Sequence, residues 1–268
     1  MEVKTVLLTG GSSGIGAATA LYLAKNGIKV YAGSRRGTVT ESHPNIVPVK
    51  LDVNDADTTK LVVERILQEE GRLDAVICNA GAGIYGPLEG TSEKDAREQF
   101  ETTYFGSLKT IEACLPVFRK QNFGRIITVT SVMAILQLPF QSLYSSAKAA
   151  LLSLSQSLSL ELKGTGIQCC SILPGDVSTG FTSARKKTEA AQKEDSPYKE
   201  WMEKNLAKIE KDELGGMSPD VIAKAIFRQL RRRHMKVRVI PRLDYKAVGF
   251  LVRILPAKLV IAAIRLIY

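Results

Sequence analysis

Tyr144 and Lys148 place a phenol and an ammonium four residues apart in the run SLYSSAKAALL, residues 142 to 152. The run is rich in helix formers, and residues four apart lie on one face of a helix. A phenol has a pKa of about 10, too high for proton transfer at neutral pH. An ammonium about 4 Å away contributes up to ~4 kcal/mol at an effective dielectric of about 20, or roughly three pKa units. The pair therefore predicts a phenol tuned for acid–base work, against the alternative of an ordinary helix surface.

A glycine-rich turn, TGGSSGIG, follows an apolar strand-like run and precedes a helical stretch. Gly10, Gly14 and Gly16 would let the backbone turn tightly and approach a pyrophosphate at the helix N-terminus, where the helix dipole favours anions. In this strand–turn–helix context the turn predicts dinucleotide binding, and the alternative is merely a tight turn. The other residues of the turn that we assign to this site are Ser12, Ser13 and Ile15.

The end of the second strand-like run, YAGSRR, indicates which dinucleotide binds. Ser34 stands where an acidic residue would bind the ribose 2′-hydroxyl of NAD, and Arg35 and Arg36 follow it. A carboxylate would repel a 2′-phosphate, whereas a guanidinium can bind one. The sequence thus favours NADP(H) over NAD, with a solvated basic loop as the alternative.

Apolar runs alternate with helical stretches from residue 4 to residue 240. The runs are nearly continuous, which is typical of parallel strands buried on both faces. Their order predicts an α/β fold with one doubly wound parallel sheet, a Rossmann fold with right-handed crossovers. The predicted strands are 4–9, 28–33, 46–50, 73–78, 125–131, 166–173 and 236–240, and the predicted helices are 14–26, 55–70, 92–120, 143–162 and 218–230.

More candidate residues lie at the carboxyl edge of that sheet, where ligands bind in such folds. Asp52 and Val53 follow the third strand, and Asp52 could reach an adenine. Asn79, Ala80 and Gly81 end the fourth strand at the same edge. All five residues are therefore predicted to contact the cofactor.

Together these motifs resemble the short-chain dehydrogenase/reductase family, and most closely its hydroxysteroid and retinol dehydrogenases. The matching motifs are TGxxxGIG, Asn-Ala-Gly, Ser131, Tyr144-x-x-x-Lys148 and PGDVST, over residues 4 to 181, with 218 to 240 similar by architecture. The resemblance implies that Tyr144 passes a proton and Ser131 holds the substrate oxygen. It also implies that Lys148 lowers the pKa of Tyr144 and binds the nicotinamide ribose. Further cofactor contacts are expected at Tyr144, Lys148, Pro174, Gly175, Val177 and Thr179.

Thr103 departs from the family's pattern. Many relatives have an asparagine three residues before a glycine in the preceding helix, as part of a proton relay, and here Thr103 precedes Gly106. A hydroxyl can donate and accept hydrogen bonds but lacks the reach of an amide. We keep Thr103 in the catalytic set as a weakened relay. It also supports an alternative function, a catalytically weak NADPH-binding regulator or scaffold of the same fold.

Composition limits the other functions that the chain could have. With 268 residues, 45% hydrophobic and 24% charged, the sequence is typical of a soluble globular protein. The four cysteines form no CxxC pair, which indicates buried thiols in a reducing, cytoplasmic compartment. The two histidines form no metal-ligand pattern, so no metal site is expected. Strand-like residues from Val6 leave no room for a signal peptide.

Two segments stand outside the family's motifs. Residues 181 to 216 have many charges and no predicted strand, and we read them as a lid over the substrate, against the alternative of a charged surface helix. The predicted domain spans residues 1 to 242, this lid included. Residues 243 to 268 form an apolar, basic extension, predicted as two short amphipathic helices, the second opening at Pro256. The aromatic and apolar residues of the lid are Phe181, Tyr198, Trp201, Met202 and Leu206.

The basic charge is concentrated near the end of the chain. Residues 1 to 184 carry as many cations as acids, so the formal net charge of +10 belongs to the last third. Cations beside an apolar helix suit peripheral contact with an anionic membrane through residues 245 to 268; the alternative is packing against this subunit or a partner subunit. No nucleic-acid recognition motif accompanies the charge, so nucleic acid is not expected as a partner.

The sequence therefore predicts an NADP(H)-dependent oxidoreductase that interconverts a secondary alcohol and a ketone or aldehyde. The substrate is expected to be a small lipophilic molecule of steroid, retinoid or acyl-chain type. A homo-oligomer, either a dimer or a tetramer, is expected from the family.

Overall fold

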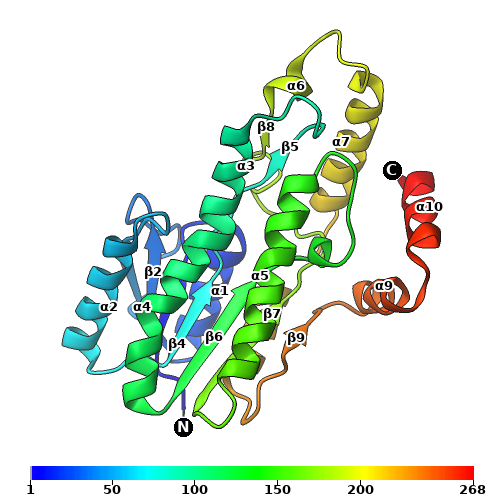
Figure 1. The fold of residues 1–268 in the computed structure, drawn as a ribbon. Helices are drawn as coiled ribbons and strands as arrows, with labels where there is room; N and C mark the ends of the chain where they lie inside the picture. The colour runs from blue at the N-terminus through cyan, green and yellow to red at the C-terminus, as the bar shows by residue number, and fades with distance from the viewer. Residues whose placement is uncertain (1) are drawn as a thin grey trace.

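Seven parallel strands form the central sheet in the order β3-β2-β1-β4-β6-β7-β9 (Figure 1). The structure is a computed structural model that describes residues 2–268. Strands β1, β4 and β6 are buried along their whole length, as the continuous apolar runs predict. The doubly wound fold is thus confirmed. The strands are β1 (Thr5–Thr9), β2 (Lys29–Ser34), β3 (Ile46–Lys50), β4 (Ala75–Cys78), β6 (Gly124–Val129), β7 (Ile167–Ile172) and β9 (Arg238–Val239).

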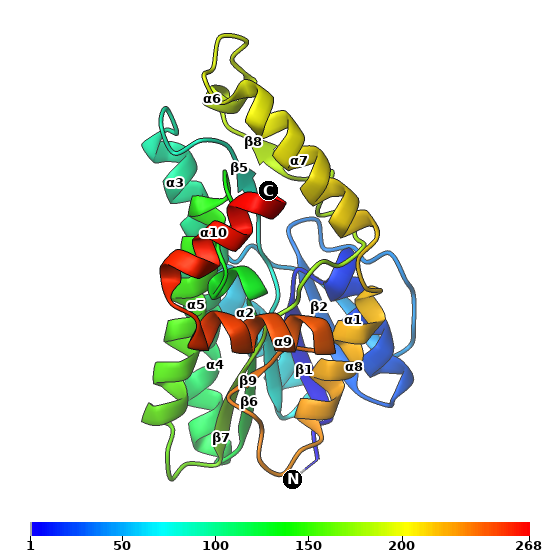
Figure 2. The ribbon, with the colours of Figure 1, turned by 90° about the vertical axis from the view of Figure 1, so that its right-hand side faces the viewer.

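Helices cover both faces of this sheet (Figures 1 and 2). Helices α1 (Gly14–Lys25) and α8 (Pro219–Leu230) pack over one face and share its hydrophobic core. The other face is covered by α2 (Ala56–Glu70), α4 (Gly106–Gln121) and α5 (Ser142–Glu161). Ser218 caps α8 through the backbone N–H of Asp220, so the predicted start of that helix is confirmed.

The stretch predicted as one helix over 92–120 is interrupted. Helix α3 (Glu93–Phe100) passes into a π-helical turn, η1 (Glu101–Phe105), before α4 begins. A π-helical turn inserts an extra residue into the helix and changes which side chains face inward, and such turns are frequent at functional sites. Sequence periodicity over the whole stretch does not reveal it.

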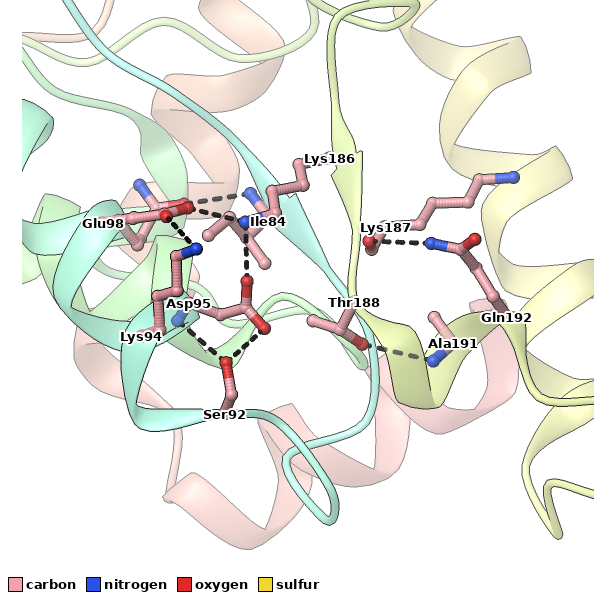
Figure 3. Close-up of polar contacts among 11 residues, drawn as sticks. Ile84, Ser92, Lys94, Asp95, Glu98, Lys186, Lys187, Thr188, Ala191 and Gln192 are labelled. Atoms are coloured by element: carbon pink, nitrogen blue, oxygen red, sulfur yellow. Dashed lines mark hydrogen bonds and ion pairs between the residues drawn. The ribbon is translucent and has the colours of Figure 1, made fainter.

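The lid segment contains a short strand, which corrects the expectation that residues 181 to 216 hold none. Strand β8 (Lys186–Lys187) pairs in parallel with β5 (Ile84–Tyr85), and is followed by α6 (Glu189–Gln192) and α7 (Lys199–Leu214). Figure 3 shows the ion pairs beside this pairing: the Lys186 ammonium lies 2.8 Å from Asp95 and 2.6 Å from Glu98 on α3. Two exposed lysines carry no strand signal, and the strand that they pair with lies about a hundred residues earlier in the chain.

The residues after β9 form two helices, α9 (Leu243–Ile254) and α10 (Ala257–Ile267), with Pro256 directly before α10 as predicted. We call residues 243–268 the tail. Helix α9 runs along the molecule near β9, and α10 then approaches α7 (Figure 2). Within residues 2–268, none of the helices is both long enough and apolar enough to span a bilayer.

Candidate active site

A cavity of about 1170 Å³ lies at the carboxyl edge of the sheet. The strand order reverses between β1 and β4, and such a switch point is where ligands bind in open α/β sheets. Three groups of residues meet in its walls: the glycine-rich turn, the phenol–lysine pair, and an apolar set from the lid and the tail. The glycine-rich turn and the phenol–lysine pair, which are distant in sequence, thus line the same cavity.

The glycine-rich turn requires its glycines. Gly10 and Gly14 have positive φ angles of 67° and 52°, which side chains rarely tolerate. A Cβ on Gly16 would lie 2.0 Å from the carbonyl oxygen of Gly10, although Gly16 itself does not line the cavity. Such a cradle lets a pyrophosphate approach the N-terminus of α1, so the turn fits a dinucleotide. The predicted turn residues that line the cavity are Gly10, Ser12, Ser13, Gly14 and Ile15.

Asn79 braces this turn from the neighbouring strand. Its side-chain amide donates hydrogen bonds of 3.1 Å to the carbonyl oxygens of Thr9 and Gly10. In return, the Thr9 hydroxyl accepts from the backbone N–H groups of Asn79 and Ala80 at 3.0 and 3.1 Å. Sequence reasoning missed Thr9, whose buried position at the end of β1 was the available signal. Asn79, Ala80 and Gly81 all line the cavity.

Of the two arginines predicted to bind a 2′-phosphate, Arg35 lines the cavity and Arg36 does not. Ser34 also lines the cavity, but its hydroxyl is engaged with the backbone of Thr38, donating at 3.1 Å and accepting at 3.2 Å. Ser34 thus occupies the position where an acid would bind the ribose of NAD, and the cation of Arg35 follows it directly. Asp52 and Val53 line the same region.

Ser131, Tyr144 and Lys148 meet in the cavity beyond the turn. Ser131 lies two residues after the end of β6 and caps a short 3-10 turn by accepting from the Met133 N–H at 3.1 Å. Tyr144 and Lys148 project from the first turns of α5, as their spacing predicts. The Lys148 ammonium donates to the Val129 carbonyl oxygen at 2.9 Å and lies 5.8 Å from the centre of the Tyr144 ring.

The charge state of this pair differs from the sequence expectation. Removal from water raises the pKa of Tyr144 to about 12, with the Ser131 side chain acting in the opposite direction. Burial also lowers the pKa of Lys148 to about 8. The sequence predicts that Lys148, helped by an oxidised nicotinamide, lowers the phenol's pKa. In the protein without cofactor, burial raises this pKa, and the side chains that lower it are Ser131 and Arg185. A protonated Tyr144 is the form that can donate a proton.

Thr103 is not brought into the cavity wall. It lies fully buried in the π-helical turn, where its hydroxyl accepts from the Gln99 amide at 3.0 Å. Gln99 also bonds to the Ala82 carbonyl oxygen at 2.8 Å and the Ile84 N–H at 2.9 Å. Thr103 therefore stands behind the loop after β4, next to Gly81, and its neighbour Thr102 lines the cavity instead.

The outer half of the cavity is largely apolar. Of the predicted lid residues, Phe181 faces it, with its ring 5.8 Å from that of Tyr144. Tyr198, Met202 and Leu206 instead pack in a separate cluster beneath the lid. Sequence reasoning did not foresee that the tail forms the remaining wall. The apolar lining residues are Leu136, Leu138, Phe181, Val248, Leu251, Val252, Leu255, Val260, Ala263, Ile264 and Ile267.

Asp176 lines the cavity with other charged residues from the lid and directly before the tail, which are Lys208, Lys211, Asp212, Glu213 and Arg242. After burial, the charges of Glu213 and then Asp176 raise the pKa of Tyr144, so these side chains share one electrostatic environment. The Tyr245 hydroxyl from the tail donates to the Asp176 carboxylate, and the Asp176 N–H donates back at 3.1 Å. The other predicted residues of this segment, which line the cavity, are Pro174, Gly175, Val177 and Thr179.

Comparison with known proteins places this site in context. The family model for short chain dehydrogenases matches residues 4–190. A 3-ketodihydrosphingosine reductase from Bacteroides thetaiotaomicron is 36% identical over 259 residues, which covers 96% of this chain and 92% of that protein. The crystal structure of a short-chain dehydrogenase from Streptomyces avermitilis superposes with a TM-score of 0.81 at 27% identity, covering 95% and 94% of the two chains.

Two further structures share the fold at lower identity. A short chain dehydrogenase/reductase from Burkholderia phymatum in complex with NAD has a TM-score of 0.78 at 22% identity, covering 93% and 92% of the chains. ElxO with NADP bound has a TM-score of 0.74 at 24% identity, covering 92% and 100%. The fold thus accommodates either nicotinamide cofactor, and fold likeness does not decide between them.

Proposed function

The chain belongs to the short-chain dehydrogenase/reductase family, oxidoreductases that act on CH–OH groups, and from that premise we propose an NADP(H)-dependent enzyme that interconverts a lipophilic ketone and its secondary alcohol. The observation that carries the proposal is the meeting of the glycine-rich turn with Ser131, Tyr144 and Lys148 in one cavity with an apolar outer half. Cytoplasmic location, peripheral membrane contact through residues 245–268 and a homo-oligomeric state belong to the same proposal.

NADP(H) is favoured over NAD by Arg35. The residue is exposed at the cavity wall, where its guanidinium can bind a 2′-phosphate. Ser34, at the position of the usual acid, leaves no carboxylate there to repel that phosphate. Gly81, Lys148 and the 174–179 segment would hold the nicotinamide half.

The chain's own groups would move the proton during ketone reduction. Tyr144 stays protonated at neutral pH, so its hydroxyl can donate to a carbonyl oxygen held beside Ser131. Lys148, with a pKa of about 8, is mostly charged at pH 7 and stabilises the phenolate that remains. A bound NADPH would supply the hydride.

The substrate that we propose is an amphiphile with a long apolar chain and an amino group beside the ketone. The apolar wall suits the chain, and Asp176 could pair with an ammonium near the reacting carbonyl. The relative named 3-ketodihydrosphingosine reductase supports this substrate class. Its match covers 96% of this chain and therefore includes most of the tail, which forms part of the apolar wall. Steroids and retinoids, also considered from the sequence, carry no cation for Asp176 to bind.

A catalytically weak regulator is not favoured by the geometry. Its support in the sequence is Thr103, and the Thr103 side chain lies outside the cavity lining, where it bonds to Gln99. The Ser131, Tyr144 and Lys148 side chains line the cavity together.

NADPH oxidation with a panel of ketones tests the proposal. The panel should contain 3-ketodihydrosphingosine, the same chain without its amino group, and steroid and retinoid carbonyl compounds. We expect turnover of the amino ketone, with a lower KM than for its amine-free analogue. Tyr144→Phe should abolish turnover while NADPH binding persists. Activity of this variant within tenfold of wild type would remove Tyr144 as the proton donor.

A further inference from the structure

The tail has two apolar sides, and one of them lines the cavity. The apolar residues that line the cavity recur every three or four positions on each helix, which places them along one side of it. Even so, neither α9 nor α10 has a buried side chain among the described residues. The tail therefore covers the cavity without forming a packed core of its own.

The opposite side of the tail is apolar and faces solvent. Nine of the sixteen large exposed hydrophobic side chains in residues 2–268 belong to the tail, so it dominates the apolar surface of the described chain. Single exposed apolar residues are ordinary, but a concentration of them marks a surface that binds something. The outward members that do not line the cavity are Leu243, Phe250, Ile254, Leu259, Ile261 and Leu266, between 52% and 89% exposed.

Cations accompany this outward side. Lys246, Arg253, Lys258 and Arg265 are all exposed, and the tail's single acid, Asp244, already pairs with Arg242. An apolar helix side with uncompensated cations suits the surface of an anionic bilayer. A symmetric contact between two tails would instead bring together two surfaces with the same positive net charge. Charge therefore favours lipid over a second copy of the chain.

Few polar contacts hold the far end of the tail to α7. The Trp201 indole N–H donates to the Tyr268 carbonyl oxygen at 3.0 Å, and the Tyr268 hydroxyl donates to Asp212 at 3.2 Å. The Lys208 ammonium lies 5.5 Å from the centre of the Tyr268 ring. Tyr268 also packs against the buried cluster of Tyr85, Met202 and Ile209, but α10 itself has no buried side chain. Segments with little buried apolar surface open at low cost in free energy. Tyr268 thus acts as a latch between α10 and α7.

We propose that the tail is a gate that opens on an anionic membrane. Its outward side docks on the bilayer, Tyr268 leaves α7, and the alkyl chain of a lipid enters the cavity between α7 and α10. The identity of the lipid and the membrane contact of the tail rest on the proposed function, whereas the opening does not depend on the proposed reaction.

Trp201 reports the latch directly, because it is the single tryptophan of the chain. The full chain is mixed with vesicles of phosphatidylglycerol or of phosphatidylcholine, and flotation and tryptophan emission are measured together. We expect phosphatidylglycerol vesicles to float the protein and shift its emission, with both effects weaker at high salt. Phosphatidylcholine vesicles should have little effect. Tyr268→Ala should shift the emission without vesicles.

Paired charge reversals supply the matched control. Lys258→Glu with Arg265→Glu should weaken binding to phosphatidylglycerol vesicles by about 30-fold or more. Lys120→Glu with Lys163→Glu makes the same charge change at exposed positions near the ends of α4 and α5, and should leave binding unchanged.

Three results would overturn the proposal. The first is that the protein floats equally with both lipids, or floats with neither. The second is that the protein floats while Trp201 emission stays unchanged. The third is that reversal of the tail charges breaks a dimer and leaves vesicle binding unchanged. No ketone is used in these measurements, so failure of the gate leaves the proposed reaction standing. Conversely, a protein that docks and opens but reduces no ketone would contradict the proposed reaction and leave the gate standing.

Discussion

Lys148 should make a contribution to the free energy of unfolding that rises with pH. Burial leaves this side chain 5% exposed and lowers its pKa from 10.5 to about 8. Between these values the unfolded chain holds a proton that the folded chain has lost, so the free energy of unfolding increases with pH. The gap between the two pKa values corresponds to about 3 kcal/mol. This destabilisation of the folded chain by the buried ammonium is fully present below pH 8 and absent above the ordinary lysine pKa.

Urea unfolding of cofactor-free wild type and Lys148→Met at pH 7 and pH 10 measures this effect. Methionine keeps an unbranched apolar side chain and removes the titrating group. The hydrogen bond to Val129 is weaker for the neutral amine than for the ammonium, and this difference is already contained in the shift of the Lys148 pKa. The difference in unfolding free energy should shift by about 2.5 kcal/mol in favour of wild type on going to pH 10. A difference that does not change with pH would refute the buried, destabilised ammonium and the reasoning built on it.

The remaining predictions concern the cofactor. Arg35→Ala should weaken NADPH binding by ~1.5–3 kcal/mol, the range for a hydrogen bond to a charged group, and leave NADH binding nearly unchanged; equal losses in a fluorescence titration would show that Arg35 does not read the 2′-phosphate. Gly16→Ala should abolish binding of both cofactors, because its Cβ would collide with the Gly10 carbonyl oxygen. Gly180→Ala, where a Cβ would meet nothing within 4 Å, should bind both as wild type does.

The sheet and the cofactor turn were predictable from sequence because their signals are local. Buried strands read as continuous apolar runs, and the glycines of the turn are required by backbone conformation at Gly10 and Gly14. The same holds for Tyr144 and Lys148, whose neighbourhood follows from helix geometry alone.

Other features depend on contacts between distant segments. Strand β8 forms by pairing with the distant strand β5, beside ion pairs from Lys186 to acids on α3. The place of Thr103 depends on a π-helical turn that periodicity does not mark. The pKa of Tyr144 depends on how deeply the folded chain buries it. The tail was foreseen as two helices, but amphipathicity does not tell which side covers a cavity.

The lid is fixed to the rest of the protein at both of its ends. Its sequence can therefore change, and with it the range of substrates, while the catalytic residues stay in place. Lys186 fixes its start to α3, and at its end the Met217 N–H donates to the Asp176 carbonyl oxygen at 2.9 Å while the Ser178 N–H donates to Met217 at 3.0 Å. Residues 189–216 therefore form a cassette between fixed anchors, as functional loops on rigid scaffolds often do. Insertions, deletions or whole exchanges within this cassette can reshape the chamber's outer half without moving Tyr144 or the cofactor turn. New lipid preferences could then arise in this lineage by replacing one segment, and an exchange of the cassette between relatives is a practical route to engineer them.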